Sequence, residues 1–215
     1  MSSVLRAAAL SAVALAAIQS ASAGFVYSSA ARETTASVGG SVVDTESTNA
    51  SGSWYGSASA NTASYVILAT QGSNLASTEM TFVGASQISA SSTATLAASS
   101  TATVTFLASA SETIRWIADL AREASGAGNS SAISLSVLDL TTLNPVLAFT
   151  GPSIGSGSFD VVSGRSYRVV VSATANAVGS TNAVANYNVG FFSTVPTPGA
   201  VALLGLAGLA GRRRR

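Results

Sequence analysis

Residues 159–171, FDVVSGRSYRVVV, decide the fold class. Phe159-Asp160-Val161 and the stretch from Tyr167 to Val171 are rich in the aromatic and β-branched residues that strands prefer. Between them lies Val162-Ser163-Gly164-Arg165, whose Ser-Gly pair is typical of a turn. The stretch therefore predicts a strand, a turn and a second strand, joined as a hairpin.

The same strand character recurs along the rest of the chain. Residues 101–106, 133–137 and 187–191 alternate apolar and polar side chains with the two-residue period of a half-buried strand. Shorter β-prone pieces occur at 65–68 and 80–83, between turn-rich stretches. The sequence predicts an all-β domain over residues 24–194, an antiparallel β-sandwich or a jelly roll.

One segment, residues 113–123, fits either a strand or a helix. Ser109 and Glu112 have the spacing of a helix capping box, and a helical stripe of apolar residues runs on to about Gly126. That helix would leave Trp116 and Leu120 off its apolar stripe. As a strand, the segment separates its apolar side chains from its charged ones. One face carries Ile114, Trp116, Ala118 and Leu120, and the other carries Arg115, Asp119 and Glu123. The strand is the favoured interpretation.

The composition excludes most familiar chemistry. The 215-residue chain is 47% hydrophobic and only 9% charged, and it has no Cys, His or Lys. This rules out disulfides, the usual zinc sites, Cys or His nucleophiles, Ser-His-Asp triads and lysine Schiff bases. We expect no cofactor and no resident metal. Between residues 24 and 194 five arginines stand against nine acids, a net charge of −4, which argues against nucleic acid as a partner.

The N-terminal 23 residues have the pattern of a secretory signal peptide. A single cation at Arg6 precedes an apolar run, and Ala21-Ser22-Ala23 supplies the small residues of a cleavage site. We expect a signal-peptide helix that is removed after Ala23, with Ala21 and Ala23 read by signal peptidase.

The C-terminal 21 residues have three parts. Val195, Pro196, Thr197 and Pro198 come first, then an apolar stretch from Gly199 to Gly211, and last the basic tail Arg212, Arg213, Arg214 and Arg215. The apolar stretch, as a short hydrophobic helix, would cover about 20 Å, less than the roughly 30 Å hydrocarbon core of a bilayer. The basic tail would hold the C-terminus in the cytoplasm by the positive-inside rule.

These residues resemble the PEP-CTERM sorting signal of bacterial envelope and extracellular-matrix proteins, in a VPTPGA variant with Thr197 where the family usually has Glu. The same signal is also found on ice-binding proteins. The resemblance implies that an exosortase, a membrane transpeptidase, recognises the segment and cuts near the prolines. The layout of the central domain is also similar to that of uncharacterised β-sandwich proteins that carry this signal.

Candidate sites within the domain are few. Asp119, Glu123, Asp139 and Asp160 could supply a glycosidase's two carboxylates, although no spacing singles out a pair. Asp44 and Glu46, near Asn49, form the densest cluster of possible calcium ligands, which an ordinary solvated loop explains better.

Two further surface features suggest binding. Threonines alternate at residues 93–95 and 101–105, as on crystalline-surface binders, but no repeat of fixed period extends them. Trp54 and Tyr55 could stack on sugars, and because adjacent strand residues face opposite sides, at most one of them should be exposed.

The sequence therefore favours an exported protein of the cell surface or extracellular matrix, with a non-enzymatic structural or adhesive role. It would be anchored in the membrane through its C-terminal segment before processing. The expected partners are signal peptidase, an exosortase-like transpeptidase, the membrane and extracellular polysaccharide. The alternative is a secreted glycan-binding module or a glycan-active enzyme that uses paired carboxylates.

Overall fold

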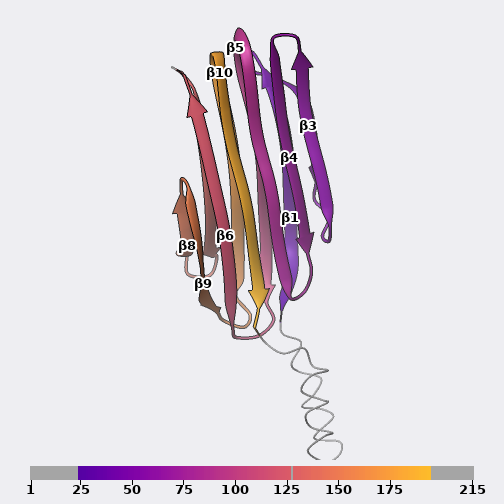
Figure 1. Ribbon diagram of the computed structural model, residues 1–215. Coiled ribbons are helices and arrows are strands. Elements are labelled where there is room, and N and C mark those ends of the chain that lie inside the picture. The colour runs from indigo at the N-terminus through magenta and orange to yellow at the C-terminus, as the bar shows by residue number, and fades with distance from the viewer. Residues whose placement is uncertain (1–23, 127, 195–215) are drawn as a thin grey trace, which may run out of the picture.

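The computed structural model describes residues 24–126 and 128–194, which form ten strands and no helix (Figure 1). The strands in chain order are β1 (Phe25–Val38), β2 (Ser41–Thr48), β3 (Trp54–Thr62), β4 (Tyr65–Leu75), β5 (Glu79–Ala108), β6 (Glu112–Ser125), β7 (Ser130–Asp139), β8 (Asn144–Thr150), β9 (Ser153–Val161) and β10 (Ser166–Ser193). The predicted all-β class is confirmed. The two predicted terminal helices lie outside the described residues.

Two very long strands, β5 and β10, hold the molecule together. They pair antiparallel along almost their whole length, and the register shifts between Val178 and Gly179. Both strands fold over there, at the top of Figure 1, so that each contributes one half to each of two layers. Strands that change sheet through a bend of this kind are one way to build a sandwich corner.

The two layers are antiparallel sheets of six strands each. In sheet I, residues 79–92 of β5 pair with β4, and the order is β3-β4-β5-β10-β6-β9. In sheet II, residues 96–108 of β5 pair with β1, and the order is β2-β1-β5-β10-β7-β8. Together they form a β-sandwich-like fold.

The hairpin predicted at residues 159–171 is half right. Both strands exist, but they do not pair with each other: β9 pairs with β6 in sheet I, and the first half of β10 pairs with β5 and β7 in sheet II. Gly164, at φ 78°, gives the chain its local reversal. The turn therefore carries the chain from one sheet to the other. The turn residues determine where the chain reverses, whereas the burial of apolar side chains determines which strands β9 and β10 pair with.

The ambiguous segment is a strand, as favoured. In β6 the side chains of Ile114, Ala118 and Leu120 are buried and Trp116 is half-buried, whereas Arg115, Asp119 and Glu123 are exposed. The expected capping residue Glu112 instead accepts a hydrogen bond from the Ser193 hydroxyl.

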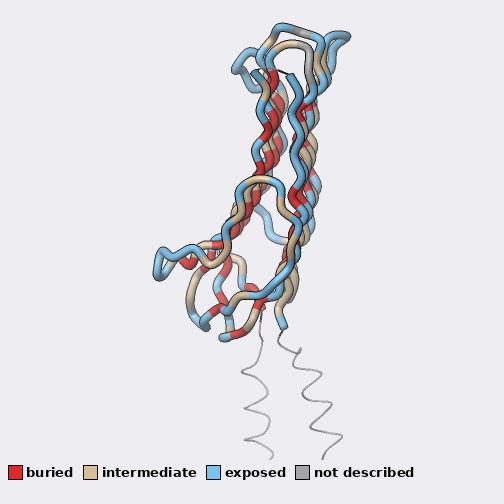
Figure 2. Tube along the Cα trace, turned by 60° about the vertical axis from the view of Figure 1, so that its left-hand side comes forward, coloured by how far each residue is buried: buried red, intermediate tan, exposed pale blue. Residues whose placement is uncertain are grey.

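The interior between the sheets has two different ends. We call one the aromatic end; its buried cluster includes Phe25, Phe82, Phe106, Tyr167 and Phe191. We call the other, next to the bend in β5 and β10, the alanine end; its buried cluster is Ala36, Ala58, Ile67, Ala69, Ile88, Leu96, Ala98, Ala175, Ala177 and Ala183. Figure 2 shows a narrow trace along the alanine end that broadens toward the aromatic end. Small alanine side chains allow the two sheets to approach each other closely, whereas aromatic rings require a wider spacing between them.

Buried polar side chains separate the two clusters. This polar belt consists of Arg32, Thr34, Gln71, Ser86 and Ser100. The Ser86 hydroxyl donates to the Ala173 carbonyl over 2.9 Å, and the Ser100 hydroxyl lies 2.8 Å from that of Tyr187. Both bonds tie sheet I to sheet II at the centre of the sandwich.

Arg32 anchors the loop between β2 and β3. Its guanidinium donates to the carbonyls of Ala50 and Gly52, the latter over 2.9 Å, and its carbon Cζ lies 5.6 Å from the centroid of the Trp54 ring. Burial lowers the pKa of Arg32, because desolvation disfavours the charged form.

Candidate functional site

A groove on the outer face of sheet I is the candidate site. Its volume is about 700 Å³, and it lies where β6, β9 and the last residues of β10 run side by side. The residues that line it are Thr113, Arg115, Trp116, Ile117, Ser156, Gly157, Ser158, Phe192 and Thr194.

The strand register explains why these side chains meet. Arg115 of β6 stands between Ser158 of β9 and Phe192 of β10 in one row across the sheet. In the next row, Ile117 stands between Ser156 and Gly190. Because side chains in a row project on the same face, the groove combines a cation, an aromatic ring and hydroxyls.

Gly190 leaves room for the Phe192 ring in the row next to that of Arg115. A Cβ atom at this position would lie 2.8 Å from the Phe192 ring and 3.2 Å from Ile117. The ring therefore leans along β10 over the glycine, an aromatic cover for a strand glycine. Phe192 also lines the groove, and its side chain is half-buried.

The polar chemistry of the groove suits binding. Arg115 is exposed, and the ion pair between Arg165 and Asp139 is the one that residues 24–126 and 128–194 contain. The nearby carboxylate of Asp160 accepts a hydrogen bond of 2.6 Å from the Thr113 hydroxyl. Arg115 thus presents its donors to solvent.

The structure does not bring the predicted carboxylates together as a glycosidase pair. Asp119 and Glu123 are four residues apart on the same face of β6, about 13 Å along a strand. Asp160 lies six positions along β9 from the residue that pairs with Asp119, about 20 Å away. Glycosidase carboxylates are about 5–9.5 Å apart.

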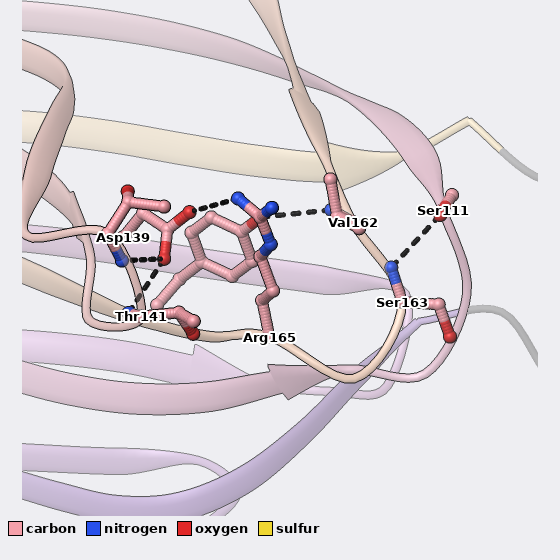
Figure 3. A network of polar contacts seen from close by, with 8 residues as sticks. Ser111, Asp139, Thr141, Val162, Ser163 and Arg165 are labelled. Atoms are coloured by element: carbon pink, nitrogen blue, oxygen red, sulfur yellow. Dashed lines mark hydrogen bonds and ion pairs between the residues drawn. The ribbon is translucent and has the colours of Figure 1, made fainter.

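Asp139, the fourth candidate, belongs to a structural network at the end of β7 (Figure 3). Its carboxylate accepts hydrogen bonds from the backbone N–H groups of Thr141 and Thr142, and it pairs with Arg165 at 3.0 Å. Burial raises the pKa of Asp139, but these donors outweigh burial and hold that pKa below its ordinary value. The carboxyl group is therefore fixed as an anion.

The same network fixes the turn between β9 and β10. The Val162 N–H donates to the Tyr167 hydroxyl over 2.9 Å, and the Ser163 N–H donates to Ser111 over 3.0 Å. A tyrosine hydroxyl bonded to backbone a few residues upstream is a recurring corner device of β-sandwiches.

The predicted calcium ligands instead protect sheet edges. Asp44 and Glu46 of β2 accept hydrogen bonds from the backbone N–H groups of Ser59 and Ser57 of β3, at 2.7 and 2.8 Å. Edge strands of the two sheets are thereby linked, and donors that could pair with another chain are occupied. Asn49 is exposed. In the part of the chain that the structure describes, no three acidic side chains gather as a metal site would need.

The threonine rows lie elsewhere. Thr101, Thr103 and Thr105 share the outer face of sheet II, where Thr35 and Ser99 of neighbouring strands bond through their hydroxyls at 2.5 Å. This face is covered with hydroxyl groups contributed by strands that are distant in sequence.

The aromatic pair follows expectation. Tyr55 is 67% exposed on the outer face of sheet I, and Trp54 turns inward toward Arg32. One of the two is available for stacking, as adjacent strand positions require.

Sequence reasoning missed the groove. Its signal was the doublet Phe191-Phe192: adjacent strand residues face opposite sides, so one ring had to be outside the core. Phe191 is buried and Phe192 half-buried.

The predicted processing residues lie outside the described residues. These are Ala21 and Ala23, Val195 to Gly199, and Arg212 to Arg215. Within residues 24–126 and 128–194, no helix has the length and apolar character to cross a bilayer. No protein-family model and no curated protein matches this chain.

Proposed function

We propose that this chain is an exported protein, displayed at the cell surface or in the extracellular matrix, with a structural or adhesive role and no catalytic one. In this proposal the first 23 residues direct export. The segment from Val195 to Arg215 holds the precursor in the membrane until an exosortase-like transpeptidase cuts near Pro196 and Pro198.

The observation that carries the proposal is where the described domain begins and ends. The Phe25 N–H donates to the Ser77 carbonyl over 2.6 Å, and the Ser193 N–H donates to the neighbouring Thr78 carbonyl over 2.9 Å. The first and last strands of the described domain, β1 and β10, therefore begin and end side by side at the aromatic end, as Figure 1 shows. A membrane tether there would leave both outer sheet faces free.

The shape fits display. Each half of β5 has about 14 residues, so the alanine end would stand about 45 Å from the tethered end. The proposal of a non-catalytic role is supported by the wide separation of Asp119, Glu123 and Asp160 and by the bound state of Asp139.

The test is a variant with Pro196→Ala and Pro198→Ala, expressed in the cells that make the protein. We expect unprocessed chain to accumulate in the membrane fraction, because the prolines, which favour an extended and accessible cleavage segment, are lost. The control is Pro152→Ala, in the exposed turn before β9, which should be processed normally. Normal release of the double variant would contradict the proposal.

A second measurement addresses the enzymatic alternative. Full-length protein incubated with a panel of polysaccharides should release no reducing ends. Turnover that disappears on substitution of Asp119 or Asp160 would overturn the non-catalytic assignment.

A further inference from the structure

We infer that the groove of sheet I binds an acidic polysaccharide, with Arg115 holding a sugar carboxylate and the Phe192 ring contacting the sugar face. This inference names a ligand for the proposed adhesive role and rests on that role for where the protein would meet such a polymer. The binding itself depends on the groove alone.

Charge identifies the acidic partner. The Arg115 guanidinium has donors only, and a carboxylate can accept two of its N–H bonds at once. Three acids face this region: Asp160 is bonded to Thr113, Glu79 lies beyond Phe192 in the same row, and Asp119 lies about 13 Å along β6 from Arg115. No ion pair joins any of these acids to Arg115 among the described residues.

The net charge of the domain opposes a polyanion, so the two effects must be weighed. The charge of −4 acts over long distances, where a Debye length of about 8 Å at physiological salt screens it. A direct contact with Arg115 is much shorter than that length and is screened less. The local cation therefore decides binding, and the affinity should fall as salt rises.

The rest of the lining suits a sugar. Phe192 packs over Gly190 and lines the groove, and an aromatic ring offers apolar contact to the C–H groups of a pyranose ring. Around it, the hydroxyls of Ser156 and Ser158 can exchange hydrogen bonds with sugar hydroxyls, and that of Thr194, which donates to the Thr113 carbonyl, can still accept one. The groove is open to solvent at the sheet surface, as a long polymer requires.

The test measures binding of full-length protein, kept in detergent, to polygalacturonate and to neutral dextran by affinity electrophoresis. We expect Arg115→Ala to weaken binding to polygalacturonate by about tenfold to a hundredfold. Arg168→Ala is the matched control: Arg168 is also exposed but lies on sheet II, outside the groove, and its loss should change affinity less than about twofold. Phe192→Leu should weaken binding to a smaller extent.

Equal losses in the Arg115 and Arg168 variants would overturn the inference, since net charge alone would then explain binding. Equal affinity for dextran, or no binding to polygalacturonate, would also overturn it. The binding assay contains no cells, so a negative result would overturn the binding inference without bearing on export and processing. Those are tested separately by the proline variants. Circular dichroism of each variant verifies that the sandwich is intact.

Discussion

The two ends of the sandwich bury their interior in different ways. At the aromatic end, the ring centroid of Phe106 lies 4.9 Å from that of Phe25 and 5.5 Å from that of Tyr167, and these three buried rings of sheet II fill the interior together. At the alanine end, seven alanines and three larger aliphatic residues fill a thinner space. The groove, the first and last described residues and the Asp139 network all belong to the aromatic end. The difference teaches that a chain with few large side chains can place most of them at one end of its core. Here they pack beneath the groove and the Asp139 network.

The largest expected effect on the free energy of unfolding comes from removing side-chain volume at the aromatic end, which we compare with adding side-chain volume at the alanine end. Phe106→Ala should lower the free energy of unfolding by about 3–5 kcal/mol, because a fully buried ring leaves a cavity. Ala98→Leu, at the alanine end, should also destabilise, by about 1–3 kcal/mol, because close sheets leave no room for added methyl groups. Urea unfolding followed by circular dichroism measures both. A stabilised Ala98→Leu protein would show that the alanine end is loosely packed and would remove the contrast.

A second prediction compares two strand glycines, one at the polar belt and one on the surface. A Cβ at Gly84 would lie 2.3 Å from the Tyr187 ring and 2.6 Å from the Ser100 hydroxyl, so Gly84→Ala should cost about 1–3 kcal/mol.

Gly72 is the matched control. Its added Cβ would meet the Tyr55 ring at 3.8 Å, an ordinary contact, so Gly72→Ala should be neutral or stabilising by up to about 1 kcal/mol. The same unfolding measurement serves for both glycines. Equal costs would mean that the belt tolerates movement and does not fix the spacing of the sheets.

The sequence was a good guide where alternation is strong. Residues 101–106 lie in β5, residues 133–137 in β7 and residues 187–191 in β10, as predicted, and the faces of β6 were assigned correctly. The length of β5 was not foreseen, because residues 84–100 are mostly small or polar and alternate weakly.

Pairing was harder to predict than the strands themselves. The wrong hairpin at 159–171 shows that a turn signal does not name a partner strand. Likewise, the outward position of Arg115 followed from alternation, but its neighbours Ser158 and Phe192 come from strands far along the chain. Their register depends on how both sheets pack, which no local pattern in one sequence reveals.

The smallest expected effect concerns the Asp139 carboxylate, which fixes the sheet-changing turn at the aromatic end. Its folded-state pKa lies below the ordinary value near 4, so its stabilising contribution is complete above about pH 4 and is lost as pH falls through the folded-state pKa.

Asp139→Asn keeps one oxygen for the Thr141 N–H but loses the charge that faces Arg165. It should lower the free energy of unfolding at pH 7 by about 1 kcal/mol. Between pH 7 and pH 3 the variant should lose less stability than the parent protein, with Asp119→Asn, an exposed acid, as the control. If parent and variant lose equal stability on acidification, other carboxylates govern the acid response, and the network at the aromatic end is held by its backbone hydrogen bonds and not by this charge.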